Sequence, residues 1–86
     1  MTVQLAKYVI TTKTDDGMVL LDQRTGRCWQ INESGALALG RLLGSATAEE
    51  AAEALVAEYE VTAERARADI QALVASLQAD KLVIAQ

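Results

Sequence analysis

Three short stretches in the first third of the chain have the composition and spacing of β-strands. Residues 8–12 are rich in β-forming types, residues 18–21 form an apolar run without a helix cap, and residues 27–31 alternate between two faces. Turn-forming residues separate these stretches at 16–17, which is Asp-Gly, and at 23–26, which ends in glycine. The pattern predicts an antiparallel meander whose last strand, 27–31, has one unpaired backbone edge.

The predicted last strand divides its side chains between two faces. Arg27, Trp29 and Ile31 fall on one face, and Cys28 and Gln30 fall on the other. Trp29 either packs in the core beneath the first helix or lines a cleft beside the strand, and both alternatives stay open. Cys28 is interpreted as a small strand residue, because the chain has no histidine that would activate a thiol.

After residue 31 the apolar positions recur at helical spacing, and polar caps divide the rest of the chain into three helices. Asn32 is a candidate N-cap for a helix over 33–43, and Thr47 with Glu50 forms a capping box for the second helix. Thr62 caps the third helix, whose apolar stripe is wide enough to face both the sheet and a cleft. That stripe consists of Ala66, Ile70, Leu73, Val74 and Leu77.

The resulting fold class is α+β, a three-stranded antiparallel sheet followed by three helices, as in a winged helix-turn-helix with the strands first. We expect residues 1–86 to form a single domain. Gly40 lies inside the first predicted helix at a cost of about 1 kcal/mol relative to Ala, and we expect it to let a neighbouring element approach closely. The apolar segment 82–84 either packs back on the core or forms a short strand.

Charge and composition narrow the classes of function. The net charge is −4, from 12 acidic against 8 basic residues, which disfavours nucleic acid as a partner because affinity for it depends on neutralising phosphates. With no histidine and one cysteine, we expect no enzyme activity, no metal and no cofactor. The chain opens without a signal-peptide pattern and has no apolar run of about 20 residues, so we expect a cytoplasmic protein without membrane contact.

Residues 20–43, L-L-D-Q-R-T-G-R-C-W-Q-I-N-E-S-G-A-L-A-L-G-R-L-L, resemble the core of the PqqD family. Members of that family show Leu-Asp-x-x-x-Gly before a strand, then Leu-Asn-x-x-Gly/Ala, then a helix that ends in Leu-Leu. Residues 47–59 and 61–83 resemble the second and third helices of the family. The chain departs from the family pattern at Ile31, at 45–46 and at 81–83, and these departures leave the implied site intact.

The resemblance implies a free-standing recognition element of the pathways that modify ribosomally made peptides, most like those of lasso-peptide biosynthesis. Such an element binds the leader segment of a precursor peptide and presents it to modifying enzymes, here a leader peptidase and a cyclase. The leader adds as an extra strand beside the third strand, in the cleft next to the third helix. On this chain the implied peptide-binding residues are Arg27, Cys28, Trp29, Gln30, Ile31, Ala66, Asp69, Ile70, Leu73, Val74 and Leu77.

Other functions stay open beside leader binding. A DNA-binding winged helix-turn-helix fits the element content, although the third helix mixes Arg65 and Arg67 with Glu64 and Asp69. A homo-oligomer would use the open strand edge on itself. Steep salt dependence of binding would favour DNA, and weak salt dependence would favour the leader. Asp69 is either a solvated helix residue or a partner for a basic residue of the leader, and Arg27 could pair with an acidic one.

Overall fold

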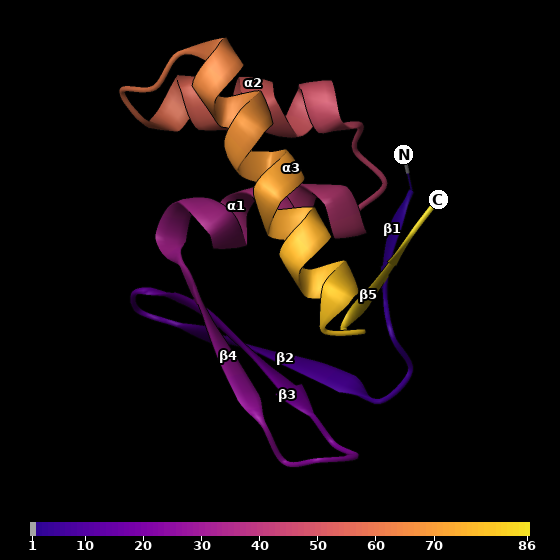
Figure 1. The fold of residues 1–86 in the computed structure, drawn as a ribbon. Helices are drawn as coiled ribbons and strands as arrows, with labels where there is room; N and C mark the ends of the chain where they lie inside the picture. Colours follow the sequence, from indigo (N-terminus) through magenta and orange to yellow (C-terminus); the bar gives the residue numbers. More distant parts are fainter. Residues whose placement is uncertain (1) are drawn as a thin grey trace.

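Residues 2–86 are described by a computed structural model with three helices and two small antiparallel sheets, in which two of the helices pack against strands and the third packs on those two helices (Figure 1). β2, β3 and β4 form one sheet in this order, and β1 pairs with β5 in a separate two-stranded ribbon beside the chain ends. The strands are β1 (Val3–Leu5), β2 (Val9–Thr14), β3 (Gly17–Asp22), β4 (Cys28–Asn32) and β5 (Val83–Ala85). The helices are α1 (Glu33–Leu43), α2 (Ala48–Glu58) and α3 (Ala63–Ala79).

The β2-β3-β4 sheet confirms the predicted antiparallel meander, with small shifts at the strand ends. The first of these strands runs from Val9 to Thr14, later than the predicted 8–12. β4 begins at Cys28 and not at Arg27. The N–H of Arg27 donates to the Thr25 hydroxyl at 3.2 Å within the turn, so Arg27 still belongs to the turn and not to the ladder.

All three predicted helix caps are confirmed. The side chains of Asn32, Thr47 and Thr62 each accept a hydrogen bond from the backbone N–H three residues later, at 2.9 to 3.1 Å. At the second cap, the Glu50 carboxylate also accepts from the N–H of Thr47 at 2.8 Å, which completes the capping box. None of the helices within residues 2–86 is long and apolar enough to span a bilayer.

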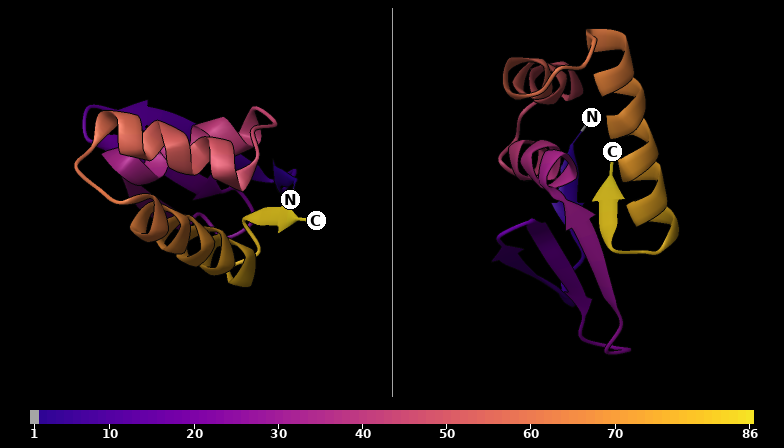
Figure 2. Two further views of the ribbon diagram at one scale, coloured as in Figure 1. Left: turned by 90° about the horizontal axis from the view of Figure 1, so that it is seen from above. Right: turned by 90° about the vertical axis from the view of Figure 1, so that its left-hand side faces the viewer.

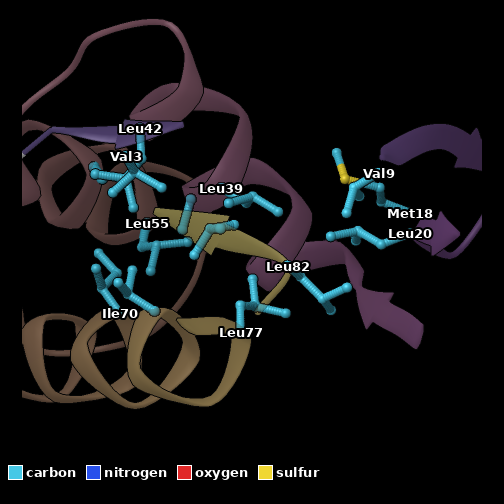
Figure 3. Close-up of a cluster of buried hydrophobic side chains, with 14 of the residues drawn as sticks. Val3, Val9, Met18, Leu20, Leu39, Leu42, Leu55, Ile70, Leu77 and Leu82 are labelled. Atoms are coloured by element: carbon cyan, nitrogen blue, oxygen red, sulfur yellow. The ribbon is translucent and has the colours of Figure 1, made fainter. Parts of the chain in front are cut away.

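The core lies between the helices and the inner face of the sheet, as Figure 3 shows. Its largest fully buried side chains come from β3, from α1, from α3 and from the segment before β5: Leu20, Leu39, Leu42, Ile70 and Leu82. The core is therefore built from leucine, valine, isoleucine and alanine, together with Met18.

The β1–β5 ribbon joins the two ends of the chain and was not predicted as a pair. Val3 lies opposite Ala85 in the register, and Val3 and Val83 both point into the core. Both alternatives for segment 82–84 are confirmed, because Leu82 and Val83 are buried in the core and Val83–Ala85 forms a short strand. The prediction for Gly40 is wrong, because a Cβ at this position would meet nothing within 4 Å.

A polar cluster ties the β3–β4 turn to the C-terminal end of α3. Asp22 is buried and accepts two hydrogen bonds from the Arg24 guanidinium, at 3.0 and 3.2 Å. The guanidinium of Arg24 lies 3.5 Å from the centroid of the Tyr8 ring, and the Tyr8 hydroxyl donates to the carbonyl of Lys81 at 2.7 Å. The hydrogen bond from Arg24 lowers the pKa of Asp22, so the carboxylate stays ionised although it is buried.

Candidate functional site

β4 is an edge strand whose side chains divide as the alternation predicted. Trp29 lies opposite Leu20 and Ile31 lies opposite Met18 in the register with β3. Leu20 and Met18 are buried, so Trp29 and Ile31 share the core-facing side of the sheet, and Gln30 faces outward with Cys28. No strand within residues 2–86 pairs with the other edge of β4.

The free edge of β4 exposes the main chain at alternate residues. Just beyond the ladder, the N–H of Asp22 donates to the carbonyl of Arg27 at 2.9 Å. In an antiparallel ladder the N–H and C=O of one residue point to the same side, and the next residue points to the other side. Trp29 therefore directs its main-chain groups toward β3, whereas Cys28 and Gln30 direct theirs away from the sheet.

A groove of about 660 Å³ lies beside this edge, between β4 and α3. Figure 2 shows α3 extending along the side of the molecule on which β4 is the edge strand. The lining comes from β4, from the start of α1 and from α3, with two contributions from α2 and the loop after it. The residues are Trp29, Gln30, Ile31, Asn32, Ser34, Gly35, Ala38, Leu55, Val61, Asp69, Ile70, Ala72, Leu73, Ser76 and Leu77.

The structure brings most of the predicted site residues into this groove. Those that line it are Trp29, Gln30, Ile31, Asp69, Ile70, Leu73 and Leu77. Two others, Ala66 and Val74, lie in the core with 0% and 4% of their surface exposed, so they support α3 from behind and do not line the groove. The apolar stripe thus divides: Leu73 is its partly exposed member, and the other four are buried.

The remaining two predicted residues, Arg27 and Cys28, lie at the turn end of β4. The guanidinium of Arg27 lies 5.1 Å from the centroid of the Trp29 ring, within the range of a cation–π contact. The Cys28 side chain is exposed, and only its main-chain groups are directed at the free edge. Neither side chain lines the groove.

Trp29 combines the two alternatives that the sequence left open. Its ring packs against the edge of the core and also lines the groove. The indole N–H donates to the Asp80 carboxylate at 3.1 Å, which connects β4 to the C-cap of α3. Asp80 is a site residue that sequence reasoning missed, because the two partners are 51 positions apart and no local motif marks the pair.

Asp69 stands at the rim of the groove and already has a partner on its own helix. Its carboxylate lies 3.2 Å from the Arg65 guanidinium, with both side chains largely exposed. Arg67, the other arginine of α3, pairs with Glu49 of α2 at 3.4 Å. Both arginines that a DNA-binding helix would need are therefore partly neutralised.

Gly35, in the first turn of α1, is a groove residue that sequence reasoning did not single out. A Cβ at this position would lie 2.8 Å from a methyl carbon of Ile31 and 3.0 Å from the Asn32 side-chain oxygen. The glycine lets α1 start directly against β4 while Asn32 caps the helix. Its signal in the sequence is its place three residues after the N-cap.

The sequence and the fold of this chain are similar to those of known proteins. Residues 17–83 match the family model of PqqD, described as coenzyme PQQ synthesis protein D. One similar solved structure is lasso peptide synthetase B1 complexed with the leader peptide, with a TM-score of 0.91 and 39% sequence identity over 99% of this chain and 100% of that chain. A second, TbiB1 in complex with the TbiA(beta) leader peptide, shares the fold at a TM-score of 0.85 and 24% identity over 96% of both chains. No curated protein matches the chain.

Proposed function

The chain belongs to the PqqD family, and from this premise we propose that it binds the leader segment of a ribosomally synthesised precursor peptide. The observation that carries this proposal is an unpaired strand edge lying beside an apolar groove. A solved structure that is 39% identical over nearly the whole chain is a complex with a leader peptide. Residues 1–86 act in this proposal as one peptide-recognition domain.

The leader adds to β4 as a fourth strand of the sheet. Five residues of β4 offer an edge of about 16 Å at about 3.3 Å per residue. The outward N–H and C=O groups of Cys28 and Gln30 bond the main chain of the leader, each hydrogen bond contributing about 1 kcal/mol net. Main-chain bonding is independent of sequence, so affinity from this source does not distinguish one peptide from another.

Selectivity comes from the side chains of the groove. A leader residue placed opposite Trp29 points its side chain to the inner face of the sheet, toward Leu73 of α3. The apolar groove there favours an aliphatic or aromatic residue. At the rim, Asp69 pairs with a basic leader residue in exchange for Arg65, and Arg27 pairs with an acidic one.

In the pathway, the chain recruits the precursor peptide to other enzymes and does not itself catalyse a reaction. In this proposal the chain holds the leader so that the leader peptidase and the cyclase of a lasso-peptide-type pathway act on the precursor. The 39% identical lasso peptide synthetase B1 supports this class of pathway. The groove is lined by apolar, hydroxyl and amide side chains with a single carboxylate, Asp69, and its lining pairs no nucleophile with a base.

A titration with the leader peptide of a neighbouring precursor tests the proposal. We expect binding at micromolar concentration or below, a change in Trp29 emission, and amide shifts concentrated on β4 and α3. A titration with duplex DNA serves as the comparison. Amide shifts only with DNA, together with steep salt dependence, would contradict leader recognition and favour the winged-helix alternative.

A further inference from the structure

A second hollow, of about 370 Å³, lies where the loop before β2, the end of α3 and β5 meet. It shares no residue with the groove beside β4. Its lining is apolar except for two lysines and one glutamine: Ala6, Lys7, Tyr8, Gln78, Lys81, Val83 and Ile84. Leader binding in the β4 groove makes no use of this surface.

The shape of the hollow is fixed by hydrogen bonding and stacking. The Tyr8 hydroxyl donates to the Lys81 carbonyl at 2.7 Å, and the Arg24 guanidinium lies 3.5 Å from the centroid of the Tyr8 ring. Lys81 itself is held in the left-handed region, at φ 62°. A preformed surface loses little side-chain freedom when a partner binds, which favours docking.

An exposed apolar side chain stands at the hollow. Ile84 is 50% exposed, and its cross-strand neighbour on β1 is Gln4, which gives it no apolar cover. A large apolar side chain left in water beside an apolar hollow is typical of a contact surface. Burial of Ile84 by a partner would remove this surface from water.

The charge of the hollow is opposite to that of the chain. Lys7 and Lys81 line the hollow, and no acidic residue lines it. The chain as a whole carries a net charge of −4. Neither lysine takes part in an ion pair within residues 2–86. Two unpaired cations around an apolar surface select a partner that presents carboxylates.

The hollow lies close to one end of the β4 groove. Trp29 lines that end of the groove and donates a hydrogen bond to Asp80, the residue before Lys81. A peptide that leaves the groove past Trp29 therefore emerges near the hollow. We propose that the hollow docks a surface segment of the enzyme that receives the leader, a segment with an apolar side chain flanked by carboxylates. The identity of that enzyme as a leader peptidase rests on the proposed function.

Calorimetric titration of the chain with the purified leader peptidase of the same pathway tests this docking site. We expect Ile84→Ser and Lys7→Glu each to weaken peptidase binding about tenfold or more, as for the central residues of an interface. Val56→Ser and Lys13→Glu are the matched controls, because Val56 is 42% exposed and Lys13 is an exposed lysine outside the hollow. Binding of the unaltered chain should also weaken as salt is raised.

Leader affinity is measured on the same samples, so that the two proposals fail separately. All four variants should bind the leader peptide as the unaltered chain does, which also shows that they are folded. The docking proposal is overturned if the unaltered chain does not bind the peptidase, if the hollow variants bind it normally, or if the controls lose as much affinity. If the unaltered chain does not bind the leader peptide, the proposed function is overturned instead.

Discussion

Leu73 offers the sharpest mutational test of the groove. It is the partly exposed member of the α3 stripe, and it lines the groove opposite the free edge of β4. In the free chain a glutamate at this position can extend its carboxylate into the open groove and stay hydrated. Leu73→Glu should therefore leave the fold largely intact.

A bound leader removes the hydration of that carboxylate, because it covers the groove and displaces the water from it. A carboxylate trapped there without a partner costs about 3 kcal/mol or more, which corresponds to at least about a hundredfold loss of affinity. Leu73→Ala is the milder change. Part of the Leu73 side chain is already covered in the free chain, so the leader buries only the rest of it. That rest is worth about one methylene group or ~0.8 kcal/mol, so we expect Leu73→Ala to lower the affinity about fourfold.

The assay is a leader titration followed by calorimetry, with circular dichroism as the check on folding. Leu37→Glu is the matched control, because Leu37 is also partly exposed but lies on α1 in a different hollow. Both variants change the net charge equally, so only the position differs. Normal binding by Leu73→Glu, or equal losses in the two variants, would refute the groove as the leader site. Unfolding of Leu73→Glu would show that Leu73 is a core residue.

Three further predictions concern single contacts. Asp69→Ala should weaken leader binding up to about fivefold, the scale of exposed charged contacts, and unchanged affinity in calorimetry would remove Asp69 from the site. Asp22 has a lowered pKa in the folded state, so it stabilises the fold above its usual pKa of 3.8, and this contribution is lost as the pH falls through the lowered value. Thermal melts should show a weaker acid dependence for Asp22→Asn, and equal acid dependence would argue against the Arg24 contact as its source. Thr62→Ala should lower the free energy of unfolding by about 1 kcal/mol through loss of the α3 cap, with leader affinity unchanged when both are measured under the same conditions.

The parts of the fold that sequence predicted are those with local causes. Asn32, Thr47 and Thr62 cap their helices through bonds to residues three positions away, so spacing alone identifies them. The β1–β5 ribbon has no such cause. Its strands have three residues each, and they pair across nearly the whole length of the chain, which no local pattern encodes.

The periodicity of the sequence predicts the site only as far as it sets the face of a strand or helix on which a side chain lies. Alternation placed Trp29 and Ile31 on one face, and the register with β3 confirms that arrangement. Helical spacing alone did not separate Leu73 from its neighbour Val74, although one lines the groove and the other is buried. That division depends on where α3 sits against the core. The Trp29–Asp80 contact likewise depends on tertiary packing and not on either local sequence.

Hydrogen exchange of the β4 amides, with and without the leader peptide, tests strand addition most directly. In the free chain we expect the outward amides of Cys28 and Gln30 to exchange rapidly and that of Trp29 to be protected by β3. Leader binding should slow exchange at Cys28 and Gln30 at least about tenfold, the effect of about 1.4 kcal/mol of protection, while Trp29 remains protected. Saturating leader with no slowing at these two amides, or with protection gained only at β2, would contradict addition of the leader to β4.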